Sequence, residues 1–398
     1  MTADLPALEG GSPVRTGAPV PFFRAPISED DLRSVTDAMR SGWLTLGPRV
    51  GEFEAACAAR VGSPHAIATS SCTSALFLAL RAFDVGAGDE VIVPSLTFAA
   101  SVNTILHTGA APVLADIELE SFGLDPGEVE SLVGPRTRGI VAVDYGGQPC
   151  RIDALRDIAD RHGLFLLEDA AHAFGAALDG HPVGSLADAT AFSFYATKCI
   201  TTGEGGMLTC ADPDLAHQVR LLGYHGMARD SWKRYSDRGS WYYEVELPGY
   251  KCNMTDVQAA LGLSQLAREP ALRASRTAVA AAYTAALAGE PAVEIPAVRP
   301  GAEHAWHLYV IRLRLDRLRC DRDQFGRALR EEGIVPSVHF IPYHRHPVGQ
   351  VALQRRPLVR TEAFAAQCLS LPIYPEMPAD ELDDVIEATV KLLHYYAR

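Results

Sequence analysis

The sequence lacks the features that would place the protein in a membrane or on nucleic acid. It has no uninterrupted apolar stretch of roughly 20 residues, the length that a bilayer-spanning helix needs. Its first residues show no basic region followed by an apolar one, so we expect no signal peptide and a flexible, Gly- and Pro-rich extension over residues 1–20. The formal net charge of −13 argues against nucleic acid as a partner, because such binding depends on clustered positive charge.

Cysteine and histidine lack the spacing of structural metal or disulfide sites. The eight cysteines contain no CxxC pair, which argues against zinc ribbons and compact disulfide frameworks and makes a reducing cytoplasm the expected location. Five histidines lack the cysteine or carboxylate company that is typical of a metal site, so we predict no metal; packing or substrate contacts explain them better. They are His304, His307, His339, His344 and His346.

Short apolar runs alternate with helical periodicity between about residues 65 and 210. Such runs are typical of strands buried on both faces, and their alternation with helices predicts an α/β fold with a mostly parallel sheet of seven strands. The expected strands are 65–69, 91–93, 112–116, 139–143, 164–168, 190–194 and 206–209.

A length of 398 residues favours two domains over one. We expect a large domain over residues 21–260, then a helical linker and a small α+β domain over residues 261–398. Periodicity predicts two helices at 256–266 and 271–287. Farther on, it predicts strands at 306–315 and 337–340 and helices at 321–332 and 379–393.

Lys198 is the first candidate catalytic residue. It follows the apolar run Phe192–Phe194 and precedes the Gly-rich turn 203–206. An amine that is desolvated or close to positive charge loses basicity and becomes a nucleophile toward carbonyl groups, which typically gives a Schiff base with an aldehyde cofactor. A surface lysine after a strand is the plainer interpretation, and only the features upstream argue against it.

Asp169 and His172 follow the apolar run that ends at Glu168. A carboxylate at the carboxyl end of a strand lies where open α/β sheets bind ligands. Beside a cofactor's pyridine nitrogen it would keep that nitrogen protonated, so that the ring accepts electrons. An N-cap aspartate is the alternative for Asp169. His172 either donates to the ring's phenolic oxygen or packs in the core.

The segment 68–76 is a strand that runs into a turn of small residues and then an apolar helix. Free amides at a helix N-terminus bind anions, so Cys72 and Thr73 are candidates for a phosphate site, with Ser193 adding a hydroxyl. An ordinary Ser/Thr cap explains the same pattern. Phe98, after another strand end, either stacks on the cofactor or packs in the core.

In their order along the chain, these segments resemble the sugar aminotransferases of the DegT/DnrJ/EryC1/StrS family, which are fold type I pyridoxal-phosphate enzymes. The likeness covers nearly everything after residue 20. The matching segments are 46–48 with Phe53-Glu54, 71–76, 94–98, 168–172, 192–198 with 203–206, His225-Gly226 and 249–260.

The resemblance implies a role for each matching residue. Lys198 would carry pyridoxal 5'-phosphate as a Schiff base, Asp169 would face the pyridine nitrogen, and Phe98 would lie under the ring. Thr73 and Ser193 would bind the phosphate, with the Cys72 amide in place of the family's commoner glycine. The family's usual glutamine is His172 here, which still donates a hydrogen bond.

The resemblance also implies a homodimer with shared active sites. The segment 249–254 would reach the phosphate of the neighbouring subunit's cofactor. Many relatives carry asparagine and arginine where this chain has Lys251 and Asn253. Lys251 is therefore the cofactor-binding residue expected from the second chain.

By family chemistry, the protein would transfer an amino group, from L-glutamate, to a nucleotide-linked keto-sugar at C4 or C3. The loop 227–250 suits that acceptor, because Arg and Lys pair with diphosphates and aromatic rings cover bases or sugars; a surface loop with incidental charges is the alternative. Its candidates are Arg229, Trp232, Lys233, Arg234, Arg238, Trp241, Tyr242 and Tyr243. We also assign substrate contacts to His225, Tyr250 and His339.

Two other functions stay open at this point. One is an aminotransferase for a different ketone, such as a cyclitol or another biosynthetic intermediate. The other is a regulator that binds pyridoxal phosphate without reacting. Related dehydratases carry histidine in place of the lysine, so Lys198 argues for amination.

Overall fold

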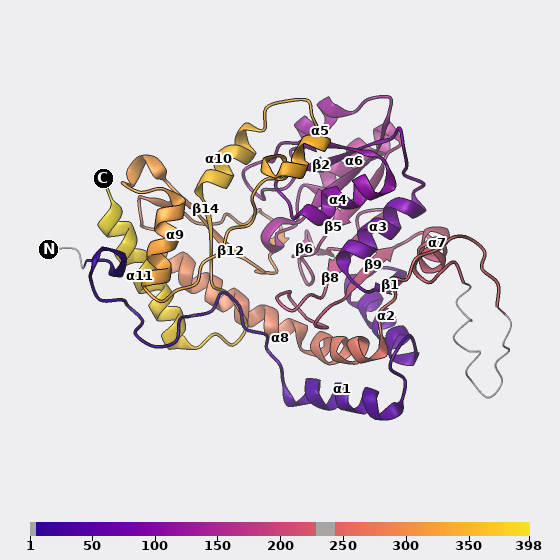
Figure 1. The fold of residues 1–398 in the computed structure, drawn as a ribbon, viewed down its shortest axis with the longest axis horizontal. Helices are drawn as coiled ribbons and strands as arrows, with labels where there is room; N and C mark the ends of the chain where they lie inside the picture. The colour runs from indigo at the N-terminus through magenta and orange to yellow at the C-terminus, as the bar shows by residue number, and fades with distance from the viewer. Residues whose placement is uncertain (1–4, 228–242) are drawn as a thin grey trace.

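The computed structural model describes residues 5–227 and 243–398, and its centre is one large sheet (Figure 1). The strand order is β1-β9-β8-β5-β4-β2-β3-β13. All neighbours pair in parallel except β9, which runs antiparallel to β1 and β8. The strands are β1 His65–Thr69, β2 Glu90–Pro94, β3 Ala111–Ala115, β4 Thr137–Val143, β5 Phe165–Asp169, β8 Ala189–Ser193, β9 Gly206–Cys210 and β13 Leu353–Gln354. The seven expected strands form, and the two-residue β13 extends the sheet beside β3.

Helices cover both faces of the sheet because its strands are apolar on both. Successive strand residues point to opposite faces: Val91 and Val93 pack toward α3, α4 and α7, whereas Ile92 packs toward α5 and α6. These helices are α3 Cys72–Ala82, α4 Ala99–Thr108, α5 Pro126–Leu132, α6 Ile152–His162 and α7 Pro213–Gly223. α2 (Pro48–Val61) packs with α8 in a further apolar cluster near β1 and β9.

One long helix, α8 (Asp256–Leu287), runs from the large sheet to a smaller C-terminal sheet with its helices, which we call the C-terminal layer (Figure 1). Helix α1 (Glu29–Ser41) lies beside α8. We expected two helices here. The chain continues through Pro270 because buried residues before and after it, such as Gln265 and Leu272, hold both halves in the core. That packing outweighs the hydrogen bond that the proline cannot donate.

The C-terminal layer is a three-stranded antiparallel sheet in the order β10-β12-β14, with its own apolar cluster. The expected helices form here, and the strand expected at 306–315 is shorter. The strand expected at 337–340 does not form; Ser337 makes a single bridge to Ser370. The elements are β10 Val293–Glu294, β12 Tyr309–Leu313, α9 Arg322–Glu331, α10 Val359–Gln367, β14 Cys368–Leu371 and α11 Ala379–Tyr396.

Three two-residue strands form a small separate sheet in the order β11-β6-β7. They are β6 Ala177–Leu178, β7 His181–Pro182 and β11 Ala302–Glu303. No helix among residues 5–227 and 243–398 is long and apolar enough to cross a bilayer.

Residues 7–20 are not the flexible extension that we expected. They lie against α9 and α11 (Figure 1), where the buried carboxylate of Glu332 accepts hydrogen bonds from Ala7 N and Val14 N, each at 2.9 Å. Val20 is fully buried and pairs with Ile334. The sequence hid this attachment because its main acceptor lies more than 300 residues away along the chain.

Candidate active site

A cavity of about 370 Å³ lies at the carboxyl ends of the parallel strands. Asp169 ends β5 and Ser193 ends β8, so the sheet itself brings them to one edge. We call this space the cofactor cavity. It is lined by Phe22, Ser71, Cys72, Thr73, Leu76, Phe98, Ala100, Asp169, Ala171, His172, Ser193, Tyr195, Thr197, Lys198, Glu204, Gly205, His307, His339 and Phe340.

Lys198 borders the cavity from the loop between β8 and β9, and backbone hydrogen bonds hold the two ends of this loop together. Phe194 N donates to Gly205 O and Thr202 N to Phe194 O, each at 2.9 Å. Burial lowers the pKa of the Lys198 amine, although the nearby Cys72 and Asp169 oppose that shift. No described carboxylate forms an ion pair with this amine, and its burial favours the uncharged, nucleophilic form.

Asp169 is buried and held by three donors. Ser101 Oγ donates to Oδ2 at 2.6 Å, Ala171 N to Oδ1 at 3.2 Å, and the Cys72 thiol lies 3.9 Å from Oδ1. Burial raises the pKa of Asp169, whereas the Ser101 and Ala171 hydrogen bonds and the Lys198 charge counteract that rise. The N-cap interpretation does not hold, because the next helix along the chain, α7, begins only at Pro213.

His172 is buried, and a backbone hydrogen bond to its Nδ1 fixes the orientation of the ring. Gly146 N donates to Nδ1 at 3.2 Å, so Nε2 carries the proton of the neutral ring. Burial, with the charge of Lys198, lowers the pKa of His172 well below its ordinary value. The ring lies 4.4 Å from that of His307. His172 is therefore a neutral donor beside the cavity.

Helix α3 begins at the cavity with Cys72 and Thr73 in its first turn. Its N-cap Ser71 accepts from Ser74 N, which leaves the amides of these two residues without intrahelical partners. Gly206 makes room beside them, since a Cβ there would lie 2.4 Å from Ser71 C. With the Ser193 hydroxyl nearby, this helix end can receive a phosphate.

The cavity contains two further predicted residues and several that the sequence did not single out. Phe98 is 62% exposed, so one ring face is open, and its ring lies 5.9 Å from that of Phe340. His339 lies 5.4 Å from the ring of Phe22, and burial lowers its pKa to about 4. Packing or substrate contact is the expectation for His307, whereas the sequence does not single out Phe22 or Phe340, although Phe340 directly follows His339. Only the tertiary structure brings them here.

Lys251, His225 and Tyr250 do not line the cofactor cavity of their own chain. Lys251 is exposed, donates to Asn253 Oδ1 and lies 5.0 Å from the Tyr224 ring. His225 and Tyr250 join each other through their backbones, at 2.8 Å, in the segment beside it. Seven loop candidates, Arg229, Trp232, Lys233, Arg234, Arg238, Trp241 and Tyr242, lie outside the described residues.

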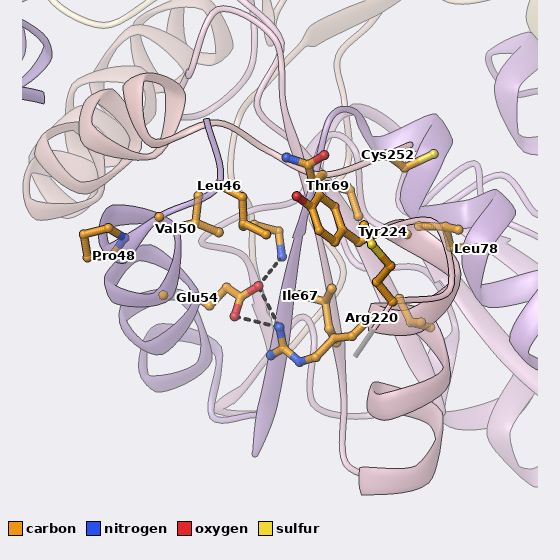
Figure 2. A pocket seen from close by; sticks show the side chains of 17 residues that line it. Leu46, Pro48, Val50, Glu54, Ile67, Thr69, Leu78, Arg220, Tyr224 and Cys252 are labelled. Atoms are coloured by element: carbon orange, nitrogen blue, oxygen red, sulfur yellow. Dashed lines mark hydrogen bonds and ion pairs between the residues drawn. The ribbon is translucent and has the colours of Figure 1, made fainter. Parts of the chain in front are cut away.

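A second cavity, of about 470 Å³, borders α2, β1 and α7 (Figure 2). Its charged groups are Glu54 and Arg220, so we call it the Glu54–Arg220 cavity. Arg220 Nη1 donates to both Glu54 oxygens, at 2.9 and 2.8 Å, and Nη2 donates to Ala66 O. Glu54 also accepts from Ala68 N. Its charges therefore bind each other and the backbone.

The residues of the cofactor cavity fit pyridoxal phosphate. The group needs a reactive amine for its aldehyde, a carboxylate for its ring nitrogen and donors for its phosphate. Lys198, Asp169 and the first turn of α3 offer these three within one cavity. Asp169 is buried and Lys198 is partly buried, whereas Thr73 at the start of α3 is exposed and lines the same cavity.

Comparisons with known proteins agree with this chemistry. The profile of the DegT/DnrJ/EryC1/StrS aminotransferase family matches residues 26–390. The spore coat polysaccharide biosynthesis protein SpsC of Bacillus subtilis is 48% identical over 93% of this chain and 96% of its own length.

Two solved structures are also similar along the whole chain. The PMP-form of the putative sugar aminotransferase Spr1654 from Streptococcus pneumoniae has a TM-score of 0.89 and 32% identity, and covers 94% of this chain and 99% of that one. DesI, crystallised in the presence of its TDP-sugar product, has a TM-score of 0.86 and 34% identity over 99% and 96% of the two chains. This protein therefore belongs to the DegT/DnrJ/EryC1/StrS family and is a pyridoxal-phosphate-dependent aminotransferase.

Proposed function

We propose that the protein transfers an amino group from L-glutamate to a nucleotide-linked keto-sugar, at C4 or C3. The observation that carries the proposal is the buried Lys198 amine, unpaired among the described residues, in one cavity with Asp169 and the first turn of α3. The likeness to DesI, which was crystallised with a TDP-sugar product, supports the choice of acceptor. The likeness to SpsC, a polysaccharide biosynthesis protein, supports a carbohydrate pathway.

When bound, the cofactor supplies an electron sink for the carbon that gains or loses the amino group. Asp169 would keep the ring nitrogen protonated, and its hydrogen bond from Ser101 would hold the carboxylate toward the ring. The Cys72 and Thr73 amides and the Ser193 hydroxyl would bind the phosphate. Phe98 would stack on the ring, and His172 Nε2–H would donate to the phenolic oxygen.

Lys198 would move the proton between carbon atoms. A lysine with an ordinary pKa is charged at neutral pH and has no lone pair to accept a proton. Burial lowers the pKa of Lys198 and so raises the fraction that acts as a base. The acceptor would contact His339 from the cavity wall, and Arg229, Trp232 and Lys233 would bind its nucleotide part.

A homodimer would complete each site. Lys251, His225 and Tyr250 do not line their own cofactor cavity, which supports a role in the cavity of a second copy. All eight cysteines are unpaired, as expected for an enzyme of the reducing cytoplasm.

Two half-reactions test the proposed function separately. L-Glutamate should convert the visible absorbance of the bound cofactor, and a subsequent keto-sugar nucleotide should restore it and yield an amino sugar detectable by mass spectrometry. TDP- and UDP-linked 3-keto and 4-keto sugars are the acceptors to compare. If glutamate acts but no keto-sugar nucleotide is aminated, the acceptor is another ketone. If no amino donor changes the spectrum, the protein binds the cofactor without transferring an amino group.

Shared sites can be tested by mixing Lys198→Ala with Lys251→Ala subunits. If Lys251 serves the neighbouring cavity, a mixed dimer has one cavity with both lysines and one with neither. After random reassociation, about one quarter of all cavities should regain tight cofactor binding and activity. No gain over the separate variants would contradict shared sites.

A further inference from the structure

Two buried carboxyl groups lie directly behind the cofactor cavity. Asp144 follows the last residue of β4, and Glu168 is the penultimate residue of β5; their exposed fractions are 0% and 1%. The pairing of these strands sets Val143 opposite Asp169, and Asp144 N donates to Asp169 O at 3.1 Å. The side chains of Asp144 and Glu168 are in hydrogen-bonding contact with each other.

The donors around this pair are too few for two ionised carboxylates. Cys150 N donates to Asp144 Oδ1 at 2.9 Å and the Cys150 thiol is a second neighbouring donor, but Asp144 Oδ2 has no hydrogen-bond partner among the described residues. Glu168 is better supplied, since Thr190 Oγ1 donates to its Oε2 at 2.8 Å. A buried oxygen without a donor is costly, and a second negative charge beside it adds to that cost.

A single retained proton removes both costs, because it gives the pair a donor and leaves one charge. Burial and the charge of Glu168 raise the pKa of Asp144 well above its ordinary value. Burial also raises the pKa of Glu168, but the hydrogen bonds from Thr190 and Asp144 oppose that rise, whereas Asp144 Oδ2 is the oxygen without a donor. Asp144 is therefore the member that keeps the proton.

Asp144 also begins the turn that orients His172. Its carbonyl accepts from Gly147 N at 3.4 Å, and Gly146 N, inside that turn, donates to His172 Nδ1. The turn is packed tightly, since Gly147 has φ +103° and a Cβ there would lie 2.9 Å from His172 O. Movement of Asp144 would therefore reach His172 through two backbone hydrogen bonds.

The charge of the pair bears on Asp169, which is next to Glu168 in the chain. Burial already raises the pKa of Asp169, and each further negative charge nearby favours its protonated form. Three ionised carboxylates in this place would work against the charge that Asp169 needs to keep a pyridine nitrogen protonated.

We propose that Asp144 and Glu168 share one proton, held on Asp144, and that Asp144 is a positioning residue for the cofactor cavity. It fixes the turn behind His172 and limits the negative charge behind Asp169. The consequence for His172 and Asp169 rests on the proposed function of those residues, whereas the shared proton does not.

The proton can be observed by infrared difference spectroscopy of the holoenzyme at neutral pH. The spectrum of the wild type minus that of Asp144→Asn should contain the carbonyl stretch of a buried protonated carboxylic acid. Labelling with [4-¹³C]aspartate should shift that band. Absence of the band, or a band that shifts with labelled glutamate instead, overturns the assignment, whatever the protein is found to catalyse.

The positioning role is tested by comparing Asp144→Asn with Asp144→Leu, which are similar in size. Asparagine keeps a donor toward Glu168 and leucine does not. We expect the dissociation constant of pyridoxal phosphate to stay within about twofold of wild type for Asn and to rise about tenfold or more for Leu. The pH midpoint of the bound cofactor's visible absorbance should move only in Leu.

Equal effects of the two substitutions on affinity and pH midpoint would overturn the positioning role. If Asp144→Leu does not fold, Asp144→Asn decides the question, since a tenfold loss of affinity in that variant contradicts the neutral, donating state of Asp144. If neither variant nor wild type gives a visible band with the cofactor, the proposed function fails while the infrared result still stands.

Discussion

The two cavities at the junction of β1 and α3 differ in how their charges are satisfied. The Glu54–Arg220 cavity is the larger, yet its ionised groups bind each other and the backbone (Figure 2). In the cofactor cavity, Lys198 has no ion-pair partner among the described residues, and burial lowers the pKa of Lys198, His172 and His339. The cavity with unpaired ionisable groups is the one suited to chemistry, and its volume does not decide this. Charges that already pair with each other stabilise the fold and are not available to react with a ligand.

The largest effect should come from Lys198→Ala. Without the amine, the cofactor cannot be fixed to the protein by borohydride reduction, and kcat should fall by at least about 10³-fold because both nucleophile and base are lost. Protein mass after reduction and turnover with glutamate measure the two losses. Lys391→Ala is the matched control: that lysine pairs with Glu332 in the C-terminal layer, so the variant should lose stability and keep the attachment.

Asp169→Asn should have the second-largest effect. We expect kcat to fall by about 10²-fold or more, because an amide stabilises a protonated ring nitrogen poorly. Stopped-flow absorbance of the glutamate half-reaction gives the rate. Near-normal rates would show that another group protonates the ring.

Arg220→Ala tests the other cavity and should affect stability instead of chemistry. It leaves the Glu54 carboxylate without its main partner, and removal of one member of a largely buried pair costs about 3 kcal/mol. Urea unfolding should show this loss while cofactor affinity stays unchanged. The double variant Glu54→Gln/Arg220→Met should recover part of the stability, since no charge is left unpaired.

The smallest effect concerns pH. The pKa of His339 falls from 6.5 to about 4 on burial, so the unfolded chain binds a proton that the folded one refuses. Stability is therefore intact above pH 6.5 and declines as pH falls toward 4. Between pH 7 and pH 5 this group costs about 2 kcal/mol. Urea unfolding at both pH values should show a smaller decline in His339→Gln, and identical declines would contradict the burial of this ring.

Local sequence determined the core of the site. The apolar runs before Asp169 and Ser193 predict strands, and parallel strands bring their carboxyl ends together at one edge. Cys72 and Thr73 open a helix that follows another strand. The proximity of these residues was therefore predictable, because each depends on short-range periodicity and on the general geometry of parallel sheets.

Only the tertiary structure decided what surrounds that core. Phe22, His307 and Phe340 reach the cavity from three distant segments, residues 7–20 attach to Glu332, and Pro270 stays inside one helix because both of its flanks are buried. The contact between Asp144 and Glu168 joins the ends of two segments whose sequence patterns predict only ordinary buried strands. Sequence patterns report which faces are buried, but not which buried groups meet, since such contacts depend on packing between segments far apart in the chain.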